Sequence, residues 1–244
     1  MQRIQPTLLR ISGALLALIA LVAPQDVGLA ETGDAISRTE SDRIVAGLRK
    51  RYAPFFAGHQ GIRSLRQVQL RIVRDGKTEN VRLQERRTDF FYRKPERTIL
   101  SATKDGQTIT AEQARGRMKP RLPPHPILDK NSASNYRLQV QKIAPCGPRS
   151  CYVIQVTPLR RTERHITGTL YVDRRTLTPT RMRGTPARLP TGGKRLSFDV
   201  YFGGAKGFPF VTRGTIQARF HVPLIVPDTT IVSRFQSREH ATVK

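Results

Sequence analysis

The sequence is poor in the residue groupings that catalytic and metal sites usually require. Its five histidines, His59, His125, His165, His221 and His240, are spread along the chain with no metal-ligand spacing between them. It contains neither a G-x-S-x-G nucleophile motif nor a G-x-x-x-x-G-K-[ST] phosphate-binding loop. We therefore expect no enzymatic activity, no cofactor and no bound metal.

Cysteine is almost absent, with only Cys146 and Cys151 in the chain. The two residues bracket a Gly-Pro turn between strand-like runs at 136–143 and 152–157, so their sulfurs lie on opposite arms of one hairpin. A redox or metal-binding pair would need a C-x-x-C spacing or histidine partners, and neither is present. In an exported protein this spacing favours a disulfide that staples the hairpin.

The chain also lacks an apolar run long enough to span a bilayer. The longest run, residues 11–23, would make a helix about 10 Å shorter than a hydrocarbon core of about 30 Å. It follows Arg3 and Arg10, and a polar stretch after it ends with Gly28 and Ala30, the small residues of a cleavage site. We interpret residues 1–30 as a cleaved secretory signal peptide, with an uncleaved N-terminal anchor as the alternative.

Acidic residues are few. The chain has 18 Asp and Glu against 43 Lys and Arg, which gives a net charge of +25, and 33 of the basic residues are arginine. Such a charge favours association with anionic surfaces, and the planar fork of arginine suits phosphate and carboxylate groups. Nucleic acid is not expected as a partner, because the chain carries an export signal and its aromatic residues do not interleave with the basic ones.

One amphipathic helix is predicted after a polar, flexible leader at residues 31–38. Residues 39–42 offer a helix cap and acidic groups for the first turn, and Pro54 and Gly58 are expected to end the helix. The apolar residues at helical spacing are Ile44, Val45, Leu48 and Tyr52.

From residue 61 the apolar period changes from 3.6 to 2, which predicts about eleven antiparallel strands. The predicted strands lie at about 68–72, 81–92, 98–102, 108–110, 136–143, 152–157, 166–172, a run through 182, 196–202, 210–220 and 231–235. Asp75-Gly76 and Asp105-Gly106 predict hairpin turns. The prolines within residues 111–135 indicate an insertion in a single domain, 39–244. The alternation favours a curved sheet, apolar within and charged outside.

The succession of elements resembles the LolA superfamily, the periplasmic carriers of the system that localises lipoproteins. The resemblance covers about residues 37–235 and depends on the helix, on FYRKPER at 91–97 before an Asp-Gly hairpin, and on TGTLYVD at 167–173. It implies a mainly β (α+β) fold in which an incomplete antiparallel β-barrel wraps the N-terminal helix. It also implies a periplasmic, non-enzymatic carrier or sensor that holds acyl chains of a lipid or lipidated protein in an apolar half-barrel.

Candidate site residues follow from that resemblance. The apolar lining of the hollow would include Val68, Leu70, Phe198, Val200, Ile216 and Phe220. Arg93 and Arg97 are candidate contacts for anionic head groups at the rim. The alternative for the lining residues is an ordinary core packed on the helix. A second functional hypothesis is a basic module without a hollow, which docks on anionic envelope lipids or on an acidic protein partner.

Overall fold

The structure is a computed structural model that describes residues 36–115, 124, 126–203, 210–222 and 226–244. The predicted signal peptide at 1–30 and nearly all of the predicted leader lie outside these residues. His125 and positions 116–123 of the predicted insertion also lie outside them. The interpretation of these segments therefore stays a prediction.

Helix α1 spans Arg38–Gly58 and begins earlier than predicted. Its N-cap is Ser37, whose Oγ accepts a hydrogen bond from the backbone N–H of Glu40 at 3.2 Å. A serine hydroxyl in that position satisfies one of the unpaired donors of the first turn, so the helix starts within the segment predicted to be a leader.

The helix ends at Gly58 as predicted, but Pro54 lies inside α1 and does not contribute to its end. Proline removes one helical N–H, and the carbonyl that would have received it belongs to Lys50, an exposed residue. The helix therefore continues for another turn to Gly58. The buried apolar residues of α1 are those predicted: Ile44, Val45, Leu48 and Tyr52.

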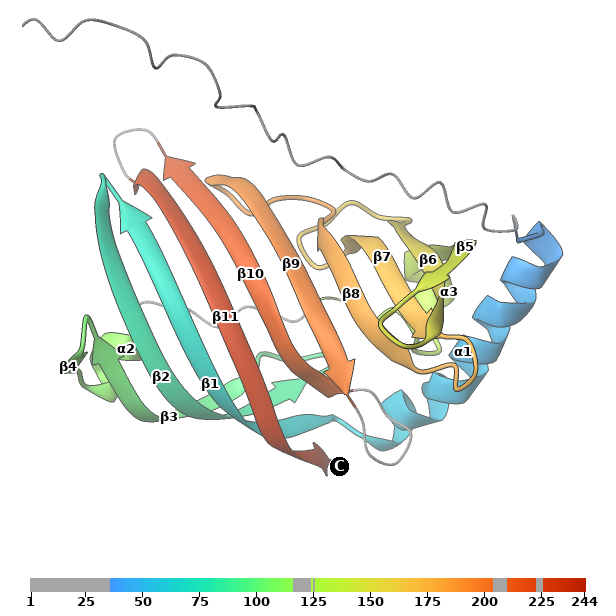
Figure 1. Ribbon diagram of the computed structural model, residues 1–244, viewed down its shortest axis with the longest axis horizontal. Helices are drawn as coiled ribbons and strands as arrows, with labels where there is room; N and C mark the ends of the chain where they lie inside the picture. Colours follow the sequence, from blue (N-terminus) through green and yellow to red (C-terminus); the bar gives the residue numbers. More distant parts are fainter. Residues whose placement is uncertain (1–35, 116–123, 125, 204–209, 223–225) are drawn as a thin grey trace, which may run out of the picture. The chain divides into compact units, whose positions relative to one another are not determined.

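Eleven strands form one antiparallel sheet, as predicted. The strands are β1 (Gly61–Arg74), β2 (Lys77–Phe90), β3 (Glu96–Lys104), β4 (Gln107–Thr108), β5 (Tyr136–Pro145), β6 (Ser150–Pro158), β7 (Ile166–Asp173), β8 (Pro179–Pro186), β9 (Gly193–Gly203), β10 (Phe210–Val222) and β11 (Val226–Val243). Their order is β4-β3-β2-β1-β11-β10-β9-β8-β7-β6-β5, so β1 and β11 are neighbours in the middle of the sheet (Figure 1). The sheet is not closed, because β4 and β5 are its two edges in the described part of the chain. The predicted mainly β fold, an open antiparallel sheet with an N-terminal helix, is confirmed.

Local turn chemistry explains the first hairpins. Asp75 and Gly76 have φ values of 49° and 74°, and Asp105 and Gly106 have φ values of 48° and 88°. Two successive residues with positive φ make the tight turn that matches the twist of paired strands, and Asp-Gly is a favoured pair for it. Both hairpin predictions are confirmed. The predicted insertion contains two short helices, α2 (Ala111–Arg115) and α3 (Ser132–Asn135).

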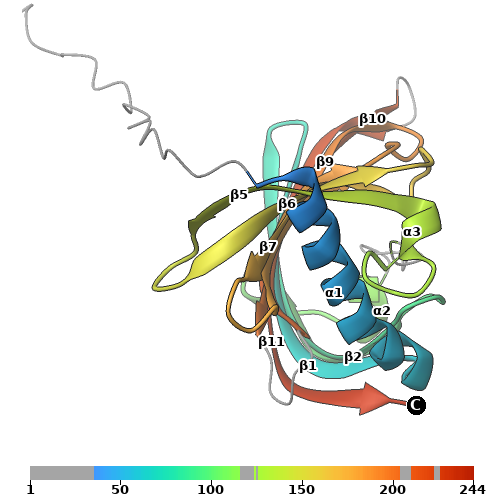
Figure 2. The same cartoon turned by 90° about the vertical axis from the view of Figure 1, so that its right-hand side faces the viewer.

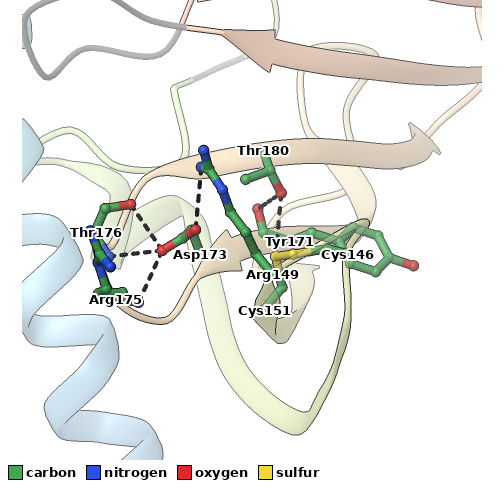
Figure 3. Close-up of a disulfide and its surroundings, with 8 residues drawn as sticks. All are labelled: Cys146, Arg149, Cys151, Tyr171, Asp173, Arg175, Thr176 and Thr180. Atoms are coloured by element: carbon green, nitrogen blue, oxygen red, sulfur yellow. Dashed lines mark hydrogen bonds and ion pairs between the residues drawn. A yellow bond between two sulfur atoms is a disulfide. The ribbon is translucent and has the colours of Figure 1, made fainter.

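The predicted disulfide is present between Cys146 and Cys151, whose Cα atoms are 5.8 Å apart (Figure 3). It closes the β5–β6 hairpin, and Cys151 is fully buried. Figure 3 also shows Asp173, at the end of β7, pointing toward Arg149 and toward the turn that contains Thr176. The disulfide and this carboxylate therefore both fasten connections at the β5–β8 end of the sheet.

The buried apolar residues form two separate cores. The first joins α1 to β5, β6, β7 and β8 and includes Leu48, Tyr52, Ile154 and Leu170. The second lies on β1, β2 and β3 beneath α2. Polar contacts add to the first core, because Ser41 Oγ of α1 accepts a hydrogen bond from a backbone N–H of β5 at 2.8 Å. Figure 2 shows α1 alongside β5 and α3.

Candidate functional site

One face of the sheet, which we call the inner face, carries both cores. Val68 of β1 lies opposite Phe235 of β11. Gly214 of β10 lies opposite both Phe235 and Val200 of β9, and Val200 lies opposite the buried Met182 of β8. Directly opposed residues of neighbouring strands point to the same face of a sheet, so these five residues share the inner face.

Between the two cores the inner face carries apolar side chains that are only partly buried. Ile216, in the middle of β10, is 38% exposed. Phe198 and Val200 contact the edge of the first core, whereas Ile231 and Phe235 contact the edge of the second. We call this set the central strip; its members, on β9, β10 and β11, are Leu196, Phe198, Val200, Ile216, Phe220, Ile231 and Phe235.

Small residues around the strip let its large side chains lie close to the backbone. A Cβ added at Gly214 would stand 2.8 Å from Val200 Cγ1 and 2.9 Å from Phe235 Cζ. At Gly184 an added Cβ would stand 3.0 Å from Phe198 Cζ. In the strip, the side chains of β9 and β11 therefore lie over glycine positions of neighbouring strands.

The six predicted lining residues divide into two groups. Val68 and Leu70 are 5% and 4% exposed and belong to the second core, where they pack with β2, β3 and α2. These two residues lie in an ordinary core, but the helix that packs on it is α2 and not the N-terminal helix of the sequence alternative. The other four, Phe198, Val200, Ile216 and Phe220, lie in the central strip.

Three residues of the strip were missing from the predicted lining: Leu196, Ile231 and Phe235. The alternation of apolar and polar residues in β9 and β11 contains the signal that could have found them. Phe235 in particular has the same parity in β11 as Ile231, and the register with Val68 fixes its face.

A charged cluster borders the strip on β1 and β2. The guanidinium carbon of Arg66 lies 4.7 Å from the centre of the Phe235 ring, and Arg66 Nη2 is 2.8 Å from Asp89 Oδ2. Arg87 Nε donates to the other oxygen of Asp89 at 2.6 Å. Burial acts to raise the pKa of Asp89, but Arg87 and Arg66 outweigh it and hold that pKa below its usual value. The cluster therefore stays ionised, with two cations on one anion.

The two arginines predicted at the rim have different surroundings. The Arg97 side chain is 8% exposed, and its Nη2 lies 2.8 Å from Glu85 Oε2 in a buried ion pair. Arg93 is 60% exposed, and its guanidinium carbon lies 3.6 Å from the centre of the Phe90 ring. Only Arg93 is placed to meet an external anion, because the guanidinium of Arg97 already faces an internal carboxylate.

Arg93 also lines a small hollow of about 380 Å³ beside the end of α1, together with Phe56, His59 and Tyr92. The Phe55 ring stacks on His59, and Phe56 and Phe91 meet edge to face with centroids 4.8 Å apart. Burial, together with a hydrogen bond to Asp129, raises the pKa of Tyr92 to about 12. The Tyr92 hydroxyl is therefore uncharged at neutral pH, and aromatic rings line the hollow beside Arg93.

Within the described ranges, no three His, Cys, Asp or Glu side chains are grouped closely enough to hold a metal ion. Among the same residues, no helix combines the length and apolarity that crossing a membrane would require. His165 is buried, with Nδ1 2.7 Å from Thr162 Oγ1 and Nε2 3.3 Å from Asn135 Oδ1. Burial and the nearby Arg160 and Arg164 lower its pKa, and both ring nitrogens have partners within the fold.

Comparison of the sequence with family models and with curated proteins gives no match. Solved structures do match. The chain is similar over 84% of its length to 93% of a LolA superfamily protein from Nitrosomonas europaea, at 12% identity and a TM-score of 0.40. A DUF1329 family protein from Desulfovibrio piger matches over 83% of this chain and 93% of its own, at 13% identity and a TM-score of 0.42. The superfamily named from the sequence is thus among the matches.

A third match is the MucA/MucB complex of Pseudomonas aeruginosa. The match spans 82% of the present chain and 99% of the matched chain in that complex, at 12% identity and a TM-score of 0.25.

Proposed function

We propose that this protein is a periplasmic, non-enzymatic carrier or sensor that holds the acyl chain of a lipid or of a lipidated protein against the central strip. The observation that carries the proposal is the partial exposure of an apolar surface in the middle of the sheet, where Ile216 is 38% exposed between two well-buried cores. Each methylene that leaves water for such a surface gains about 0.8 kcal/mol, so an acyl chain is an energetically suitable occupant.

The surroundings of the strip suit a ligand with a polar end. Arg66 lies over Phe235 at one border, and the Arg66, Arg87 and Asp89 cluster carries an excess of one positive charge. Both guanidinium groups already donate to Asp89, so the net charge of the cluster would attract an anionic end group without a free arginine fork to bind it. The predicted export signal and the resemblance to periplasmic lipoprotein carriers agree with a ligand from the cell envelope.

Mass spectrometry of lipid extracted from the mature protein, purified from its native compartment without detergent, tests the proposal. A stoichiometric lipid or acylated peptide is expected. If the protein is empty and stays empty after incubation with envelope lipids, the proposal is wrong.

A matched pair of variants locates the site. Ile216→Asp should abolish uptake of a fluorescent fatty acid, because it places a carboxylate in the middle of the strip, at a side chain that is 38% exposed in the folded protein. Leu159→Asp changes a residue that is 49% exposed outside the strip and should leave uptake unchanged. Circular dichroism confirms that both variants fold, and equal uptake by the two would exclude the strip as the site.

A further inference from the structure

The opposite face of the sheet, which we call the outer face, carries an open groove of about 480 Å³ over β1, β9, β10 and β11, in which polar side chains lie among apolar lining atoms. The side chains that matter for the argument are Gln67, Gln69, Tyr201, Arg213, Arg234 and Gln236. They alternate along their strands with inner-face residues such as Val68, Val200 and Phe235. The groove and the central strip therefore lie on opposite sides of the same central strands.

The register sets these residues in two adjacent rows. Gln236 of β11 lies opposite Gln67 of β1 on one side and Arg213 of β10 on the other. In the next row Gln69 lies opposite Arg234. Arg213 and Arg234 are thus diagonal neighbours, a relationship that places Cβ atoms about 7–8 Å apart in a sheet, within reach of one shared anion.

The positive charge of the groove is not neutralised from within. Arg213 and Arg234 are both exposed, and in the part of the chain that the structure describes no carboxylate forms an ion pair with either. The acid on the neighbouring strand, Asp199, is already held by two hydrogen bonds from Arg181, at 2.8 and 2.5 Å. An anionic ligand would supply the missing partner.

Tyr201 fixes one of the two arginines in place. The guanidinium carbon of Arg213 lies 4.6 Å from the centre of its ring, and that of Arg181 lies 5.0 Å from it. Cation–π contacts of this kind hold a long side chain in a defined position before a ligand arrives. Because the ring already contacts two guanidinium groups, it is not a free platform for stacking a nucleic acid base.

The uncharged lining indicates what else the ligand carries. Each glutamine offers two donor hydrogens and one acceptor oxygen, and three of them line the groove. Sugar hydroxyls are both donors and acceptors and match this set, whereas acyl chains do not. An extended peptide would need an unpaired strand edge, and β1, β9, β10 and β11 are each paired on both sides.

We propose that this outer groove binds an acidic glycan, a chain of sugars that carry carboxylate groups, with Arg213 and Arg234 on a carboxylate and the glutamines on hydroxyls. This site is separate from the lipid site of the proposed function and does not depend on it.

Isothermal titration of the folded protein with a galacturonic acid oligomer tests the proposal, with a neutral glucose oligomer of the same length and a poly-glutamate peptide of the same charge as comparison ligands. The galacturonate oligomer should bind, and the other two should bind at least about tenfold more weakly.

Arg213→Gln with Arg234→Gln should weaken binding at least about tenfold, the loss expected from one charge-assisted hydrogen bond. Gln67→Ala with Gln236→Ala should weaken it several-fold and keeps the test decisive if the arginine variant does not fold.

Arg43→Gln with Arg137→Gln is the matched control, because it removes the same charge from exposed positions on α1 and β5. It should bind the galacturonate oligomer as the unchanged protein does. Absence of binding would overturn the proposal. Equal binding of poly-glutamate or of a single-stranded oligonucleotide, or equal losses in the control and groove variants, would overturn it as well, because attraction by net charge alone would then explain the binding.

Discussion

Glu85 of β2 and Arg97 of β3 form an ion pair with 2.8 Å between Oε2 and Nη2, and their side chains are only 1% and 8% exposed. Arg87 Nη1 lies 3.8 Å from the other oxygen of Glu85. The pair lies on the inner face of the sheet, beyond the apolar residues of the second core. Removal of one member of such a pair leaves the other charge buried without its counter-charge.

Glu85→Gln should therefore lower the free energy of unfolding by about 3 kcal/mol or more. Urea denaturation at pH 7 measures the change. Glu96→Gln is the matched control, since the Arg93–Glu96 pair is 60% and 67% exposed with 3.7 Å between its charged atoms. Exposed pairs contribute at most about 1 kcal/mol, so similar losses in the two variants would contradict the burial argument.

Asp173→Asn should destabilise the protein at neutral pH but not in acid. Oδ1 of Asp173 accepts hydrogen bonds from the backbone N–H groups of Arg175 and Thr176, at 2.9 and 2.8 Å (Figure 3). The bonds from Thr176 are the main cause of a pKa below the usual value for this carboxyl group, although burial acts in the opposite direction.

A carboxyl group with a lowered folded-state pKa adds stability that is fully present above its unfolded pKa of about 3.9 and is lost as pH falls through the folded value. The difference in unfolding free energy between the unchanged protein and Asp173→Asn should be about 1–2 kcal/mol at pH 7 and should shrink below about pH 4. Urea titrations at a series of pH values measure it. A difference that is the same at pH 7 and pH 2.5 would show that the charge is not responsible.

Replacement of both Cys146 and Cys151 by alanine should lower the free energy of unfolding by no more than about 3 kcal/mol, because the closed loop is short. Thermal or urea unfolding with and without a reductant measures the effect. The reduced, unchanged protein should approach the stability of the double variant. If the reductant also destabilises the double variant, the disulfide does not explain the difference.

Two glycine-to-alanine changes should have opposite effects. An added Cβ at Gly214 would meet Val200, Phe235 and the carbonyl of Asp199 at 2.8–3.0 Å, so Gly214→Ala should destabilise the sheet by about 1–3 kcal/mol and displace part of the central strip. Gly47 lies inside α1 with no atom within 4 Å of such a Cβ. Gly47→Ala should raise stability by about 0.5–1 kcal/mol, because alanine loses less backbone entropy in a helix. Thermal unfolding of both variants measures the two changes in stability. If both changes had the same sign, the packing argument would be refuted.

The sequence predicts the strands well because apolar and polar residues alternate along a strand wherever one face of the sheet is buried and the other is exposed. The Asp-Gly turns add the hairpin connections, and the cysteines add the staple. The position of Glu85 could not be predicted in this way: it occupies an inward position after Val81 and Leu83, where the pattern indicates an apolar residue. Its burial depends on Arg97, which arrives from the next strand.

The division between core and candidate site was also out of reach of the sequence. Val68 and Ile216 both alternate with polar neighbours and are equivalent by pattern. They differ in the structure because α2 and two neighbouring strands bury Val68, while Ile216 lies beside the small Ser233. Long-range contacts decide which residues of the inner face are buried by other segments. The local periodicity of the sequence does not encode these contacts.

The pairing of β1 with β11 has a consequence for the order in which the protein folds. Hairpins such as β1–β2 and β5–β6 need only short loops to close, whereas β1 meets β11 only after the whole intervening chain has been gathered. Distant pairing of this kind is slow, because the entropy of closing the loop is lost before the contacts form. We expect the two cores to assemble first as separate halves. The central strands would join last, and until then the strip and its strand edges would be the surface most exposed to aggregation and proteolysis.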